Sequence, residues 1–62
     1  MTDAEWIADK ELKRDAAERE RAAATDPKVE RSRRAKRDRY QAMLTIGREG
    51  VRAIAAKAAA SR

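Results

Sequence analysis

The sequence contains no cysteine, no histidine and no phenylalanine, and it has one tryptophan and one tyrosine among its 62 residues. Without cysteine, no disulfide can cross-link the chain, and without both cysteine and histidine a structural zinc site lacks its usual ligands. The common general base and the thiol nucleophile are missing too, and no glycine-rich phosphate loop is present. We therefore expect no catalytic activity, no metal site and no cofactor.

Long apolar runs are equally lacking. No stretch approaches the length of a transmembrane helix, and the first 20 residues are rich in charge, without the apolar segment of a secretory signal. The pattern predicts a cytoplasmic protein.

Bulky apolar side chains are scarce. Hydrophobic residues make up 42% of the chain, but most of them are alanine. A chain of this length buries a smaller share of its surface than a larger domain does, and few large side chains are available to fill a core. We infer that a partner chain supplies further burial, and self-association is its simplest source.

What the chain has in abundance is helix formers. Residues that favour strands are few and do not alternate with polar ones. The single proline, Pro27, follows Asp26, so the pair fits the N-cap and first position of a helix. We predict an all-α fold of two helices, about residues 3–24 and 27–59, joined by a turn at 25–26. They would form one module (1–62), as a helical hairpin or an open L within a dimer or higher oligomer.

The first helix carries a strong start signal. Thr2 and Glu5 have the spacing of a capping box, and Met1 and Trp6 occupy the positions of a hydrophobic staple. Its predicted apolar stripe is thin, and Trp6 is displaced from it. The stripe consists of Ala4, Ala8, Leu12, Ala16 and Ala23.

The second helix carries a better apolar stripe. At 100° per residue its members fall within an arc of about 100°. They are Val29, Tyr40, Met43, Leu44, Gly47, Val51, Ile54 and Ala58. We interpret this stripe as the interface for self-association. A continuous helix would place Gly47 where another helix backbone can approach closely, whereas a kink or a loop at 47–50 is the alternative.

Charge is divided unevenly along the chain. Residues 1–27 carry five bases and eight acids, whereas residues 28–62 carry eleven bases and three acids. Seven bases fall between residues 28 and 39. They are Lys28, Arg31, Arg33, Arg34, Lys36, Arg37 and Arg39. Such a cluster neutralises phosphates and releases counterions, which predicts a nucleic-acid-binding segment. Alternatively, these bases pair with the acidic first helix, within or between chains, or are simply solvated.

Two short resemblances bear on this prediction. The basic segment 31–39 and the stripe after it resemble a basic-region leucine zipper in arrangement, but no asparagine for base readout and no leucine heptad are present. Residues 46–50 resemble the GxxG loop of KH domains over five residues, without the strands of that fold. Only the general arrangement, an arginine-rich helix beside an oligomer interface, is carried forward.

The sequence thus predicts a small helical nucleic-acid-binding accessory or regulatory protein, with DNA and RNA equally open. The alternative is a protein-only adaptor, inhibitor or small structural subunit whose second helix docks on a larger protein. A membrane-surface role is not expected, because the stripe has no tryptophan or phenylalanine to anchor it.

Overall fold

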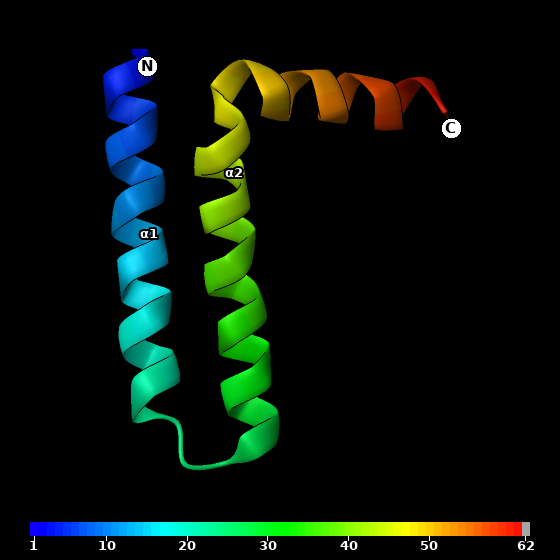
Figure 1. The fold of residues 1–62 in the computed structure, drawn as a ribbon. Coiled ribbons are helices and arrows are strands. Elements are labelled where there is room, and N and C mark those ends of the chain that lie inside the picture. The colour runs from blue at the N-terminus through cyan, green and yellow to red at the C-terminus, as the bar shows by residue number, and fades with distance from the viewer. Residues whose placement is uncertain (62) are drawn as a thin grey trace.

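The computed structural model describes residues 1–61, which form two helices, α1 (Asp3–Ala23) and α2 (Pro27–Ala60), and no strand. The helices lie side by side and antiparallel along the length of α1 (Figure 1). The predicted all-helical fold of two helices is therefore confirmed, and of the two predicted arrangements, a hairpin or an open L, the helices form the hairpin, whereas association into oligomers stays a prediction.

The helix ends are fixed by the capping signals that the sequence shows. The Thr2 hydroxyl accepts a hydrogen bond from the Glu5 amide at 3.2 Å, and the Glu5 carboxylate accepts one from the Thr2 amide at 3.0 Å. At the start of α2 the Asp26 carboxylate accepts from the Lys28 amide at 2.8 Å. Both predicted N-caps are confirmed, so the connection between the helices is held to three residues, 24–26.

A sharp bend divides α2 at Gly47, which has φ 81° and ψ 169°. This backbone conformation is strained for any residue with a β-carbon, so glycine is needed at this position. Residues 48–60, called the arm below, leave the bend on the side opposite α1 (Figure 1). The prediction of an uninterrupted helix from 27 to 59 is therefore wrong, and the alternative of a kink is correct.

The position of the bend follows from the length of α1. The Arg48 guanidinium donates hydrogen bonds to the Met1 carbonyl at 2.7 Å and to the Asp3 carboxylate at 3.0 Å. Gly47 is therefore level with the N-terminus of α1. A straight α2 would have no neighbouring helix to pack against beyond this point.

The face of α1 that packs on α2 differs from the predicted one. Trp6 and Ala17 are the buried residues, whereas Leu12 is 66% exposed. Ala4, Ala8 and Ala23 are exposed as well, and Ala16 is half-buried. Burying the large indole removes more apolar surface from water than burying the alanine stripe would, and Ala17 lets the two backbones approach. Met1, the other residue of the predicted staple, remains 72% exposed.

The contact face of α2 follows a seven-residue repeat, with spacings that alternate between three and four. Its half-buried members are Glu30, Arg33, Arg37, Tyr40, Leu44, Gly47 and Val51. The hairpin is therefore polar near its connection and apolar near its open end, where Trp6 lies.

Candidate nucleic-acid interface

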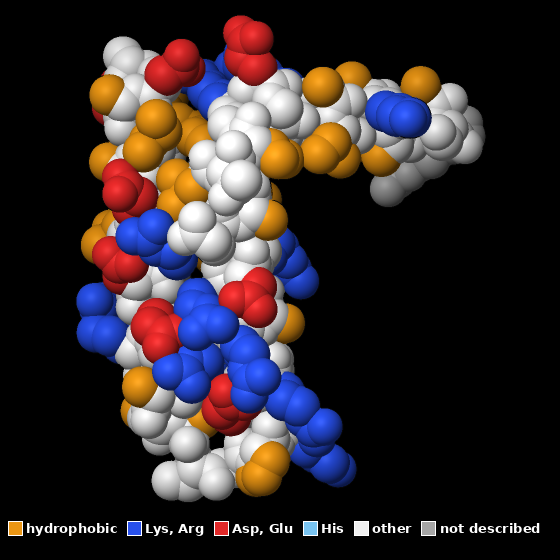
Figure 2. Space-filling view, viewed as in Figure 1, with side chains coloured by type: hydrophobic (Ala, Val, Ile, Leu, Met, Phe, Trp, Pro, Cys, Tyr) orange, Lys and Arg blue, Asp and Glu red, His pale blue; other side chains and the backbone are white. Residues whose placement is uncertain are grey.

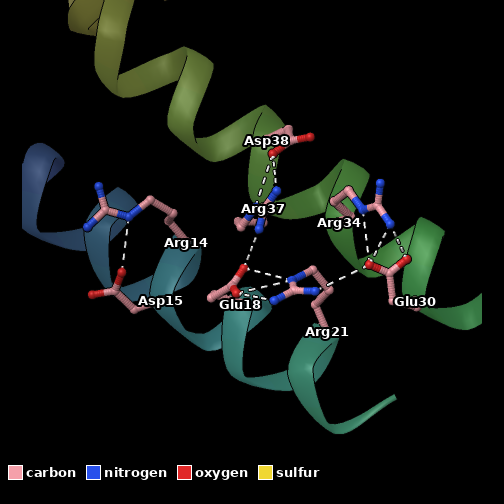
Figure 3. A network of polar contacts seen from close by, with 8 residues as sticks. All are labelled: Arg14, Asp15, Glu18, Arg21, Glu30, Arg34, Arg37 and Asp38. Atoms are coloured by element: carbon pink, nitrogen blue, oxygen red, sulfur yellow. Dashed lines mark hydrogen bonds and ion pairs between the residues drawn. The ribbon is translucent and has the colours of Figure 1, made fainter. Parts of the chain in front are cut away.

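The basic segment of α2 begins beside a network of ion pairs centred on Glu18 of α1 (Figure 3). The Glu18 carboxylate accepts hydrogen bonds from Arg37 at 2.6 Å and from Arg21 at 3.0 Å. Arg21 also reaches across to the Glu30 carboxylate at 3.3 Å, and Glu30 accepts from Arg34 at 2.7 Å. The network therefore links both helices through alternating charges.

Electrostatics at this network favour the ionised carboxylates. Hydrogen bonds from Arg21 and then Arg37 lower the pKa of Glu18 to about 2. Arg34, and to a smaller extent Arg21, lower the pKa of Glu30. These two acids are therefore charged throughout the neutral range, and the arginines that hold them are engaged within the chain.

Further polar contacts fix the register of the two helices. The Arg33 guanidinium donates to the Glu20 carbonyl at 2.9 Å, and Arg14 donates to the Gln41 side-chain oxygen at 3.1 Å. Together with the contacts of Arg48, they span the hairpin from its connection to its open end. They lie on exposed or half-exposed side chains, so each is expected to contribute little alone.

Three of the seven predicted nucleic-acid-binding bases are thus occupied. Arg33 and Arg37 contact α1, as the alternative of intramolecular pairing anticipated, and Arg34 pairs with Glu30 one turn earlier in α2. Their guanidinium groups can bind phosphate only by giving up these partners.

The other four bases point elsewhere. The side chains of four bases are exposed and make no hydrogen bond or salt bridge to any of residues 1–61: Lys28, Arg31, Lys36 and Arg39. At 100° per residue Lys28, Arg31 and Arg39 fall on the side of α2 opposite its contact face, whereas Lys36 lies further round, at the edge of the contact face. Figure 2 shows basic side chains extending from this side of the molecule. We call these four residues the outer basic face.

The predicted interface stripe is divided by the hairpin and the bend. Tyr40, Met43, Leu44, Gly47 and Val51 are half-buried, most of them toward α1 of the same chain. Val29 is 39% exposed, Ile54 is 60% exposed, and Ala58 is exposed. The first helix therefore covers the central part of the stripe, and only the ends remain open to a partner.

Sequence reasoning missed a shallow hollow of about 420 Å³ beside the bend, lined by Asp38, Gln41, Ala42, Thr45 and Ile46. Ile46, one of its walls, is 47% exposed and was not part of any predicted stripe. The available signal in the sequence was an isoleucine directly before a glycine. This pair of residues indicates an exposed apolar surface only when the chain is known to bend at the glycine.

The cation over the only tryptophan was missed too. The Lys10 ammonium lies 5.6 Å from the centre of the Trp6 ring, and it also pairs with Asp9 at 3.0 Å. The lysine therefore covers the indole at the open end of the hairpin while its charge stays paired.

No protein family, curated protein or solved structure matches the chain. Among residues 1–61, neither helix has a stretch long and apolar enough to cross a membrane. Within the same part of the chain, no cluster of three acidic, histidine or cysteine side chains is arranged to hold a metal ion.

Proposed function

We propose that this protein is a small nucleic-acid-binding accessory or regulatory protein that contacts phosphates through its outer basic face. The proposal rests on one observation: the seven bases of segment 28–39 are divided between intramolecular contacts and exposed positions. Arg33 and Arg37 contact α1 and Arg34 pairs with Glu30 within α2, while the side chains of the other four bases are exposed and have no acidic partner among residues 1–61. The helix thus presents to solvent cations that have no ion-pair partner in the described part of the chain.

The dimensions of this face suit a duplex backbone. Lys28 and Arg39 are eleven residues apart, a rise of about 16 Å on an α-helix. Over that length a duplex carries roughly nine phosphates, several of which are within reach of four long side chains. The contact would be governed by charge and would discriminate little between base sequences.

The test is a salt titration of binding to a short DNA duplex and, in parallel, to an RNA duplex. If all four cations neutralise phosphates, the slope of log K against log salt is at most about −3.6. The variant K28Q/R31Q/K36Q/R39Q should lose most of the affinity and flatten this slope.

A matched control variant distinguishes the effect of where the positive charges lie from the effect of how many are removed. The variant K13Q/R19Q/R52Q/K57Q removes the same number of positive charges from other exposed positions. It should retain most of the binding, with a slope close to that of the original chain. Equal losses in the two variants, or no binding by the original chain at low salt, would refute the proposal.

A protein-only adaptor, inhibitor or structural subunit is the second candidate, and the arm is the observation that favours it. Beyond Val51 every described residue of the arm is exposed, Ile54 among them. In this case the chain would show no retention on nucleic acid at low salt, and Ile54→Asp would abolish partner binding while the outer basic face is intact.

A further inference from the structure

The inner side of the bend presents an apolar surface bordered by positive charge. A β-carbon at Gly50 would lie 3.2 Å from the Ile46 β-carbon, so Gly50 of the arm faces Ile46. Ile54 follows Gly50 by one turn on the same face of the arm. Ile46 and Ile54 are 47% and 60% exposed, and Ile46 also lines the hollow together with Ala42 and Asp38. We call Ala42, Ile46 and Ile54 the elbow surface.

Two cations border the elbow surface. Arg39 precedes Ile46 by seven residues and Lys57 follows Gly50 by seven, so each lies on the same helix face as its neighbour. Both are exposed, and neither makes a salt bridge to residues 1–61. An occupant of this surface should therefore be a helix with an apolar ridge flanked by acids.

The outer face of α1 has this chemistry. Leu12 is 66% exposed, and Ala8, one turn earlier, is exposed as well. Glu11 and Asp15 lie beside Leu12 on this face; Asp15 pairs with Arg14 at 3.0 Å, whereas the Glu11 side chain has no hydrogen-bond or ion-pair partner among residues 1–61. We call Ala8, Glu11, Leu12 and Asp15 the outer α1 face.

We propose that the elbow surface binds the outer α1 face of a second copy of this chain. Leu12 of one copy would pack against Ile46 and Ile54 of the other, with its acidic flanks near Arg39 and Lys57. One chain cannot make this contact with itself, because the arm leaves the hairpin on the side opposite α1 (Figure 1). The proposal does not depend on nucleic-acid binding.

The geometry determines the kind of oligomer. The elbow surface and the outer α1 face lie on opposite sides of the hairpin, so two rigid copies can share only one such contact. The contact is therefore head-to-tail, and it leaves one elbow and one α1 face free for further copies. Because a short arm buries less surface than a standard protein interface, the association should be weak and sensitive to salt.

The experiment measures molar mass by sedimentation equilibrium, without nucleic acid, up to about 1 mM, where contacts of this size associate. The original chain should exceed the mass of a dimer as its concentration rises. Leu12→Asp and Ile54→Asp should each remain monomeric. An equimolar mixture of the two variants has one intact elbow and one intact α1 face, so it should form a dimer and nothing larger.

Controls keep the result interpretable. Val29→Asp introduces the same charge at an exposed apolar residue outside both surfaces, and it should associate as the original chain does. Circular dichroism checks that each variant is helical, and Leu12→Gln and Ile54→Gln replace any aspartate variant that is not. An original chain that stays monomeric, single variants that still associate, or a mixture that does not dimerise would overturn the proposal.

Discussion

Glu18 is the acid on which the polar half of the hairpin depends, because it accepts hydrogen bonds from Arg21 in its own helix and from Arg37 in the other. Its ordinary pKa of 4.5 is lowered to about 2 in the fold. The folded state therefore binds its proton less readily than the unfolded chain does, and the resulting stabilisation is present above pH 4.5 and disappears as the pH falls toward 2.

We therefore predict that Glu18→Gln lowers the melting temperature at neutral pH, and that the difference from the original chain disappears between pH 4.5 and 2. Thermal melts followed by circular dichroism measure this. Glu20→Gln is the matched control, because the Glu20 side chain is exposed and makes no hydrogen bond to residues 1–61. If the difference in melting temperature between Glu18→Gln and the original chain persisted at pH 2, the negative charge of Glu18 would not be the cause of the stabilisation.

Trp6 and Leu12 make a second comparison between single side chains. Trp6 is 9% exposed and Leu12 is 66% exposed. Truncating a buried tryptophan costs about 3–5 kcal/mol, whereas an exposed substitution usually changes stability by less than about 0.5 kcal/mol. We predict that Trp6→Ala largely unfolds this small hairpin and that Leu12→Ala melts like the original chain at low concentration. Melts of similar temperature for the two variants would mean that the helices pack on different faces.

Gly47 is the residue that decides the shape of α2 at the level of the element. Its positive φ is strained for alanine, although a β-carbon would meet no atom within 4 Å. The segments on both sides of Gly47 are helical, and their apolar positions would stay on one face of a continuous helix. Alanine at this position therefore disfavours the bent backbone and at the same time favours a continuous helix.

We predict that Gly47→Ala straightens α2. Spin labels at exposed positions 35 and 59 would be about 36 Å apart in a continuous helix, and closer in the bent one. Pulsed electron resonance should show a clearly longer distance in Gly47→Ala than in the original chain. Glu49→Ala is the control, because Glu49 is exposed and has no positive φ. Equal distances in Gly47→Ala and the original chain would refute the prediction.

At the level of the whole molecule, the two parts of α2 should differ in local stability. Residues 27–46 pack along α1, whereas every described residue of the arm beyond Val51 is exposed. A helix of this length is marginal in water without tertiary contacts. We predict that amide protons of residues 52–60 exchange orders of magnitude faster than those of residues 33–44 in dilute solution.

Hydrogen exchange followed by NMR measures this difference in exchange rate. Repeating the measurement at several protein concentrations tests whether association protects the arm. Protection of the arm should rise at concentrations where copies associate, and it should not rise in Leu12→Asp. An arm as protected as residues 33–44 in dilute, monomeric protein would contradict the prediction.

Local signals in the sequence determined the helical class, the two N-caps and the position of the connection. Thr2, Glu5, Asp26 and Pro27 act on backbone groups within a few residues of themselves, so their effect does not depend on distant parts of the chain. The charge imbalance was equally visible, but seven similar bases could not be sorted from their sequence positions alone.

Only the tertiary structure decided which faces met. The hydrogen bonds of Arg48 set the register that places Gly47 level with the N-terminus of α1. In α1, the face with Trp6 is buried and the alanine stripe that the periodicity favoured is not. The tertiary structure also separated Arg33 and Arg37, which hold α1, from the outer basic face. These outcomes depend on which surfaces from distant parts of the chain pack together most favourably. The spacing of residues along the sequence does not show this.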